Sequence, residues 1–311
     1  MKSKTSLVRL GSLAHKSLNL TAFASAIAVV IVGVLYFVDG RELLGVSVWE
    51  KPLKFFISAA FYSATFSWLF SYVEEGVRFA RMMGHIIAAT LGIELLVIVG
   101  LAAVGARSHF NVSSPFHIWM WSIMAAAITA AWVATFLLGA TLWKSTRMSD
   151  EIKLAVRWAL GIGLAGMGIA FTMTSPQPNQ TTADGWQGIA GAHTVGAADG
   201  GAGIPFFGWS IEAGDLRVSH FLGLHGLQAI PLVTVILLMT INSHAYRVAA
   251  INAIAILYAG LVVVTYVQAL RGESILSPST TTINSLALVV LAALVVGAWA
   301  RFRKAKTPTL S

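Results

Sequence analysis

The chain has 311 residues, of which 57% are hydrophobic and 11% are charged, and it contains no cysteine. Soluble domains carry about 25% charged residues, so this composition excludes an ordinary soluble protein and is typical of a membrane protein. The lack of cysteine excludes disulfides, thiolate metal sites and iron–sulfur clusters. The net charge of +8 does not indicate nucleic-acid binding, because the basic residues lie in short clusters beside apolar segments, where they orient helices in a lipid bilayer.

Apolar stretches follow one another along the chain, each close to the roughly 20 residues that cross a hydrocarbon core of about 30 Å. We therefore predict one transmembrane domain over residues 1–311, an all-α bundle of about eight helices. The predicted spans are 18–38, 52–72, 83–105, 117–142, 155–174, 220–241, 247–268 and 283–300. The basic N-terminus resembles a signal peptide, but the apolar stretch after it, about 21 residues, is longer than a signal peptide's. We expect a retained first helix.

The distribution of lysine and arginine predicts the orientation of the bundle. If the N-terminus is cytoplasmic, the cytoplasmic side holds fifteen basic residues: Lys2, Lys4, Arg9, Lys16, Arg78, Arg81, Lys144, Arg147, Lys153, Arg157, Arg247, Arg301, Arg303, Lys304 and Lys306. The other side holds six: Arg41, Lys51, Lys54, Arg107, Arg217 and Arg271. Basic residues concentrate on the cytoplasmic side of membrane proteins. We expect a multi-pass protein of the plasma (inner) membrane with both termini in the cytoplasm.

One connection, residues 175–219, is much longer than the others. It has 45 residues, nine of them glycine. Loops of more than about 15 residues tend to be lids, binding loops or disordered linkers. Trp186, Trp209 and the Phe206-Phe207 pair favour partial packing onto the bundle. A flexible spacer between two four-helix halves is the alternative.

A weak internal similarity favours two such halves in the same orientation. The string Glu50-Lys51-Pro52-Leu53-Lys54-Phe55, with which the second helix opens, is similar to Asp215-Leu216-Arg217-Val218-Ser219-His220-Phe221, with which the sixth opens. The third and seventh spans end near Arg107-Ser108 and Arg271-Gly272. Parallel repeats of this kind are one way to build a membrane bundle.

Four strings resemble those of an uncharacterised group of bacterial multi-pass membrane proteins. They are Trp49-Glu50-Lys51-Pro52-Leu53-Lys54-Phe55, Ser108-His109-Phe110-Asn111, Gly214 through Gln228 with the pattern Gly-Asp-Leu-Arg-x-x-His-Phe-x-Gly-Leu-His-x-x-Gln, and Gln268-Ala269-Leu270-Arg271-Gly272. The resemblance covers the second to the seventh span. It implies a bacterial membrane location and no particular activity or cofactor.

All four strings lie at the outer ends of predicted helices. We therefore expect a polar pocket beneath the long loop, on the extracytoplasmic side. Its predicted ligand-binding residues are Lys54, Arg107, Arg217, His220, His225 and Gln228. Helix N-termini flanked by cations favour anions, so an anionic ligand or head group fits best. Interfacial lysines and arginines that only extend towards water and lipid head groups are the alternative.

Histidines on the same side could bind a metal or haem, and His109, His220 and His225 are the candidate ligands. On a regular helix His220 and His225 point about 140° apart, and the spacing matches no compact ligand motif. Hydrogen-bonded structural histidines are the other interpretation.

Glu94 lies near the middle of the third span. A carboxylate at that depth is costly, so we expect Glu94 to be buried in the bundle and protonated. One hypothesis is a station on a proton path. The other is a neutral acid hydrogen-bonded to a neighbour, and Tyr62, Thr129 and Tyr258 are predicted at similar depth.

These observations leave three functions open. The first is a membrane protein that binds or moves a small molecule or ion at the outer pocket, and it is favoured slightly. The second is a membrane-embedded enzyme or redox protein that uses the outer histidines. The third is a sensor or assembly factor without catalysis.

Overall fold

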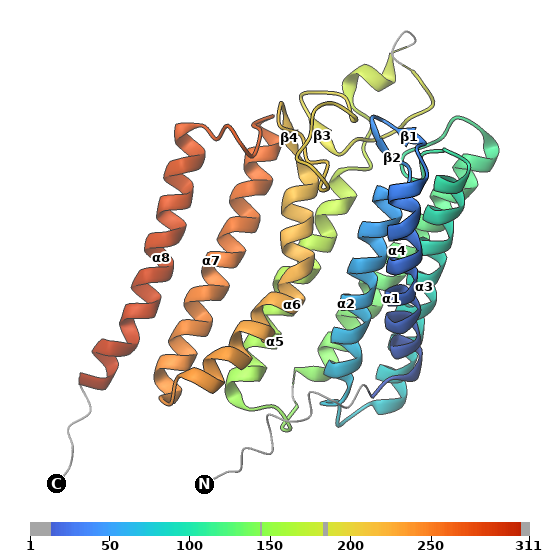
Figure 1. The fold of residues 1–311 in the computed structure, drawn as a ribbon. Helices are drawn as coiled ribbons and strands as arrows, with labels where there is room; N and C mark the ends of the chain where they lie inside the picture. Colours follow the sequence, from blue (N-terminus) through green and yellow to red (C-terminus); the bar gives the residue numbers. More distant parts are fainter. Residues whose placement is uncertain (1–13, 144, 183–185, 306–311) are drawn as a thin grey trace, which may run out of the picture.

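The computed structural model describes residues 14–143, 145–182 and 186–305, and within them eight long helices form the bundle (Figure 1). The helices are α1 (Lys16–Val38), α2 (Glu50–Phe70), α3 (Val77–Ala103), α4 (Pro115–Leu142), α5 (Asp150–Thr172), α6 (Leu216–Thr240), α7 (His244–Leu270) and α8 (Thr280–Ala305). Each contains a stretch long and apolar enough to cross a membrane. The prediction of an all-α, multi-pass membrane protein with eight spans is confirmed.

The helices begin a few residues before the predicted spans, and in α1, α4, α5 and α6 a polar side chain caps the start. The Ser149 hydroxyl accepts a hydrogen bond from the Ile152 backbone N–H, so α5 begins at Asp150 and not at 155. Ser114 caps α4 in the same way. Hydropathy detects only the apolar part of a helix, whereas a capped polar first turn extends beyond it.

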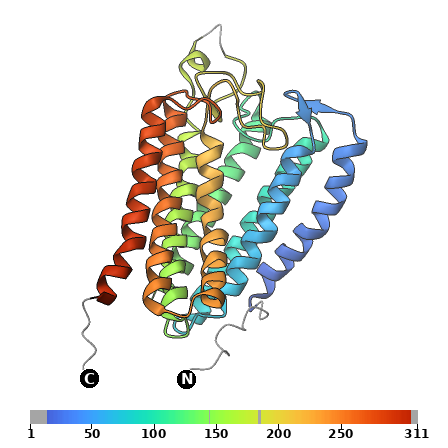
Figure 2. The same cartoon turned by 60° about the vertical axis from the view of Figure 1, so that its left-hand side comes forward.

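The helices pack in the same order in two successive groups of four (Figures 1 and 2). In each group the first helix packs most closely on the second and the third on the fourth, with smaller contacts between the second and third and between the first and third. The two groups, α1–α4 and α5–α8, meet where α4 contacts α5 and α2 contacts α6. This arrangement supports two four-helix halves of the same orientation.

Short strands occur at equivalent places in the halves. β1 (Glu42–Leu43) and β2 (Val46–Ser47) pair antiparallel between α1 and α2. β3 (Thr194–Val195) and β4 (Gly214–Asp215) pair antiparallel between α5 and α6, where the 3-10 helix η2 (Pro178–Thr181) also lies. The first helices of the two halves both have 23 residues, and the third helices both have 27.

The closest helix contact joins α5 and α6 through glycines. A Cβ atom placed on Gly166 would lie 2.5 Å from the Gly223 backbone. Around this contact the main core contains Phe66, Leu138 and Leu227, all fully buried. Large apolar side chains elsewhere, such as Leu96, are exposed and suit contact with lipid.

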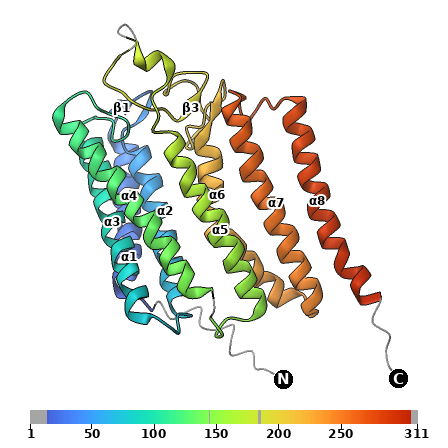
Figure 3. The ribbon, with the colours of Figure 1, turned by 180° about the vertical axis from the view of Figure 1, so that it is seen from behind.

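The two ends of the bundle differ. The connection between α5 and α6 covers one end, which we call the loop face (Figure 3). The other end, where α1 begins and α8 ends, we call the terminal face (Figure 1).

Candidate ligand-binding layer at the loop face

The α5–α6 connection, residues 173–215, is tied to both halves of the bundle. Towards the first half, the Ala190 N–H donates to the Phe110 carbonyl and the Val112 N–H donates to the Gly188 carbonyl, both at 2.8 Å. Towards the second half, Gly214 lies against the Ala269 carbonyl at the end of α7. The interpretation of this loop as a flexible spacer is therefore wrong for the described residues, because backbone hydrogen bonds hold it across the bundle.

Two cationic side chains from different halves converge on adjacent carbonyl groups of this loop. Lys54 on α2 donates through Nζ to the Phe207 carbonyl at 3.1 Å. Arg217 on α6 donates through Nη2 to the Gly208 carbonyl at 2.5 Å. The turn that they hold is strained, because Phe206 has a φ of 66°, which is unusual for an aromatic residue.

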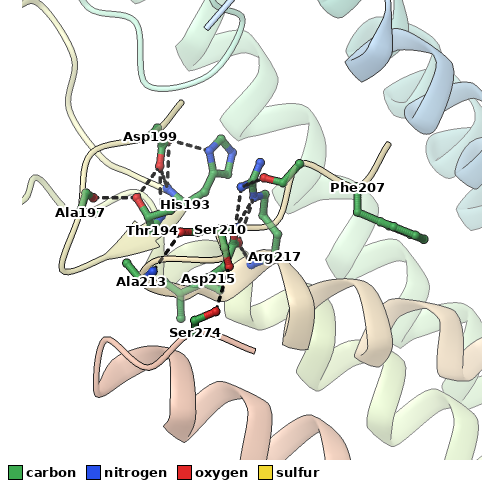
Figure 4. A network of polar contacts seen from close by, with 12 residues as sticks. His193, Thr194, Ala197, Asp199, Phe207, Ser210, Ala213, Asp215, Arg217 and Ser274 are labelled. Atoms are coloured by element: carbon green, nitrogen blue, oxygen red, sulfur yellow. Dashed lines mark hydrogen bonds and ion pairs between the residues drawn. The ribbon is translucent and has the colours of Figure 1, made fainter. Parts of the chain in front are cut away.

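A buried carboxylate accompanies each cation. Lys54 Nζ lies 2.7 Å from Glu50 Oε1, and Arg217 Nη2 lies 2.6 Å from Asp215 Oδ2. The exposed fractions of Glu50 and Asp215 are 5% and 3%. Asp215 also caps α6 and accepts the Ser210 N–H of the loop, as Figure 4 shows. Both cations are therefore balanced and ordered beneath the loop.

The loop contributes a His–Asp pair of its own, which Figure 4 shows beside the Asp215–Arg217 pair. His193 Nδ1 lies 2.7 Å from Asp199 Oδ2, and Asp199 also accepts from the Thr194 backbone and hydroxyl. Burial alone would raise the pKa of Asp199, but the hydrogen bonds from His193 and Thr194 hold it well below its usual range. Burial lowers the pKa of His193. The sequence does not predict the His193–Asp199 pair, because nothing in the spacing of the two residues indicates the turn that joins them.

His109 lies at the connection between α3 and α4, under the same loop. Lys51 on α2 donates from Nζ to His109 Nδ1 at 2.9 Å, and the rings of Phe55 and Trp121 lie against the imidazole. Burial, helped by the charge of Lys51, lowers the pKa of His109 well below its usual value. Lys51 forms no ion pair within 4 Å among the described residues, and the sequence analysis did not include it in the site.

The other predicted ligand-binding residues lie deeper or apart. His220 donates from Nδ1 to the Gly166 carbonyl of α5 at 2.8 Å. His225 contacts Ser58 of α2 at 3.3 Å and Gln228 Oε1 at 3.2 Å. The two histidines thus point to different helices, as their spacing predicted.

Gln228 and Arg107 differ in how their side chains are engaged. Gln228 Nε2 is buried and has no hydrogen-bond partner in the described part of the chain. Arg107 is half-buried, and within the described ranges its guanidinium makes no hydrogen bond or ion pair, while its carbonyl accepts from Asn111. The structure does not bring the Arg107 guanidinium into contact with Lys54 or Arg217, and the ligand-binding role of all six predicted residues stays a prediction.

Glu94 is buried, as predicted, with an exposed fraction of 5%. Its Oε2 atom has no hydrogen-bond partner among the described residues. The expected neighbours bond elsewhere: Tyr62 to Thr135, Tyr258 to the Leu222 carbonyl, and Thr129 to the Ala125 carbonyl.

No group of three or more His, Asp or Glu side chains in the described ranges is arranged to hold a metal ion. His109, His220 and His225 therefore do not form such a group there. Comparisons of the chain with protein families, with curated proteins and with solved structures return no match. The fold and the contacts define a polytopic membrane protein with an ordered polar layer at the loop face.

Proposed function

We propose that this protein binds a small anionic molecule or ion in the layer formed by the starts of α2 and α6 and by the Phe207–Gly208 turn. The observation that carries the proposal is the convergence of Lys54 and Arg217, from different halves, on two adjacent carbonyls. Cationic donors at the starts of two helices are the usual surroundings of a bound anion.

The turn acts as a gate in this proposal. Each carbonyl occupies a position that an oxygen atom of an anion would take, so an anion that displaces the turn replaces both hydrogen bonds. The strained φ of Phe206 lowers the cost of releasing the turn. Glu50 and Asp215 keep the cations in place while the gate is open.

The remaining predicted residues surround this gate. Gln228 Nε2 is a buried donor without a partner among the residues that the structure describes, and it lies one helical turn from His225 at the contact between α2 and α6. We place the loop face on the extracytoplasmic side of the plasma membrane, because the basic residues concentrate at the other face. The resemblance to a group of bacterial membrane proteins agrees with this location.

The test is thermal stability of the purified protein in a neutral detergent with phosphate, sulfate, bicarbonate or acetate at constant ionic strength. An anion at 100 times its Kd should add about 2.7 kcal/mol of stability. The anion should no longer stabilise the double variants Glu50→Gln/Lys54→Gln and Asp215→Asn/Arg217→Gln. Each of them replaces a cation together with its carboxylate partner, so no buried carboxylate is left unpaired.

Arg41→Gln is the matched control, because Arg41 is a loop-face cation whose partner is Asp39 in the α1–α2 connection. It should keep the full response. If no anion stabilises the protein more than chloride, or if the double variants respond like Arg41→Gln, the proposed site is wrong.

A membrane-embedded enzyme or redox protein is the second candidate, and the partly buried His193–Asp199 pair favours it. Such a pair orients an imidazole as a general base. An absorbance spectrum and a metal analysis of the purified protein separate the candidates: a haem band or a stoichiometric metal supports the second.

A further inference from the structure

A second polar site lies at the terminal face, far from the layer described above. A pocket of about 350 Å³ opens there between the end of α2, the start of α3 and the connection between α4 and α5. Its lining is mixed: Phe70, Val73 and Val77 contribute apolar surface, and two arginines, Arg81 and Arg147, stand at it.

The charge of the pocket is not balanced. The Arg81 guanidinium lies 5.9 Å from the centre of the Phe70 ring, and it makes no ion pair or side-chain hydrogen bond in the part of the chain that the structure describes. Arg147 faces Glu74 at 3.5 Å. Two arginines against one carboxylate leave one positive charge in excess.

Glu74 is held by other groups. The Thr146 N–H and hydroxyl donate to it at 3.2 and 2.9 Å, and the hydrogen bond from the Thr146 backbone lowers the pKa of Glu74. The carboxylate therefore stays ionised and bonded to Thr146 when Arg147 turns towards a ligand.

The depth of the pocket limits what can occupy it. It lies where helices of a membrane bundle end, so we expect its arginines to lie at the level of lipid head groups. Cationic pockets at that level suit anionic lipid head groups. The glycerol part of such a lipid would cover the exposed side chain of Val77, which free phosphate would leave uncovered.

We propose that this pocket binds an anionic phospholipid, with its phosphate between Arg81 and Arg147 and its glycerol backbone against Phe70, Val73 and Val77. The site is independent of the proposed anion layer at the loop face. A bound lipid would contact both the start of α3 and the α4–α5 connection, and it would thereby stabilise the first half of the bundle.

The test measures lipid binding to the purified full-length protein by native mass spectrometry, with phosphatidylglycerol, phosphatidylcholine and inorganic phosphate as separate probes. Phosphatidylglycerol should half-saturate the protein at a concentration about tenfold lower than phosphatidylcholine, which corresponds to 1.4 kcal/mol. Inorganic phosphate should not compete at equal concentration.

Arg81→Gln and Arg81→Gln/Arg147→Gln should remove the preference for phosphatidylglycerol. Arg78→Gln, which changes an exposed arginine three residues earlier on α3 and outside the pocket lining, should keep it. The preference should also weaken as salt is raised.

Three outcomes would overturn the proposal. The first is equal affinity for the two lipids, and the second is an Arg81→Gln variant that binds phosphatidylglycerol as the unchanged protein does. The third is saturation by inorganic phosphate alone, which would assign the pocket to a free anion.

Discussion

At the scale of single residues, Glu94 combines deep burial with an oxygen atom that has no hydrogen-bond partner among the described residues. A buried carboxylate without a hydrogen bond is costly when ionised and much less so when protonated. We therefore expect Glu94 to be neutral in the folded protein.

We expect Glu94→Gln to accumulate in the membrane at the level of the unchanged protein, because the amide keeps the shape of a neutral carboxyl group. Glu94→Lys should fail to accumulate, since it would bury a cation in the interior of the bundle. Glu75→Lys, in the exposed turn between α2 and α3, is the control and should accumulate. Immunoblots of membrane fractions measure all three. Normal accumulation of Glu94→Lys would mean that the residue faces a wet cavity.

A pH dependence follows from the partly buried histidines His109 and His193 of the loop face. The folded-state pKa values of His109 and His193 lie below the ordinary value of 6.5, so the unfolded chain binds more protons than the folded protein once the pH falls below that value. Stability is therefore present in full above about pH 6.5 and is lost as the pH falls further.

Melting temperatures between pH 8 and pH 5 measure this effect. We expect a plateau at high pH and a decrease in acid, with each histidine contributing up to about 1.4 kcal/mol per pH unit. His109→Gln should flatten the decrease, whereas His85→Gln, which removes an imidazole at the other face, should not change the contribution of His109. If the melting temperature of His109→Gln falls as steeply with pH as that of the unchanged protein, His109 is not the source of the decrease.

At the scale of helices, the α5–α6 contact depends on the absence of side chains. Gly166→Ala would place a methyl group 2.5 Å from the Gly223 backbone, and the two helices would have to separate. Overpacking of this kind costs about 1–3 kcal/mol. The melting temperature in detergent should fall clearly.

Gly168→Ala tests the same change two residues further along α5. A Cβ atom there meets nothing within 4 Å, and alanine is favoured over glycine in a helix by about 1 kcal/mol. We expect this variant to melt at or above the temperature of the unchanged protein. Equal losses in the two variants would mean that helix propensity, and not the contact with Gly223, controls the result.

At the scale of the whole molecule, the orientation in the membrane can be tested with single cysteines, because the chain has none of its own. Thr182 in the long loop and Glu75 at the terminal face are both exposed. An impermeant maleimide added to intact cells should label Thr182→Cys. It should label Glu75→Cys only after the membrane has been permeabilised. The reverse pattern would contradict the prediction of cytoplasmic termini.

Ser145, also in a terminal-face turn, is unsuitable as the inner position. It is buried, and its hydroxyl donates to the Tyr72 carbonyl. A cysteine there would stay unlabelled on either side of the membrane, so the result would not report orientation.

The sequence by itself determined the class of the protein, the number of spans and the burial of Glu94. These properties follow from hydropathy, which is local: about 20 apolar residues must cross the bilayer, and an acid among them must turn inward. It also placed the polar strings at one end of the bundle, because short connections keep the ends of successive helices together.

Only the tertiary structure decided which polar groups meet. The contacts of Lys54 with Phe207, of Lys51 with His109 and of Arg217 with Gly208 join residues from different elements, and hydropathy carries no information about such pairs. The bonds of Tyr62 and Tyr258 to groups other than Glu94 have the same origin. From the sequence alone, a long loop rich in glycine is expected to be flexible. The order of this loop comes from hydrogen bonds to residues that lie far away along the chain.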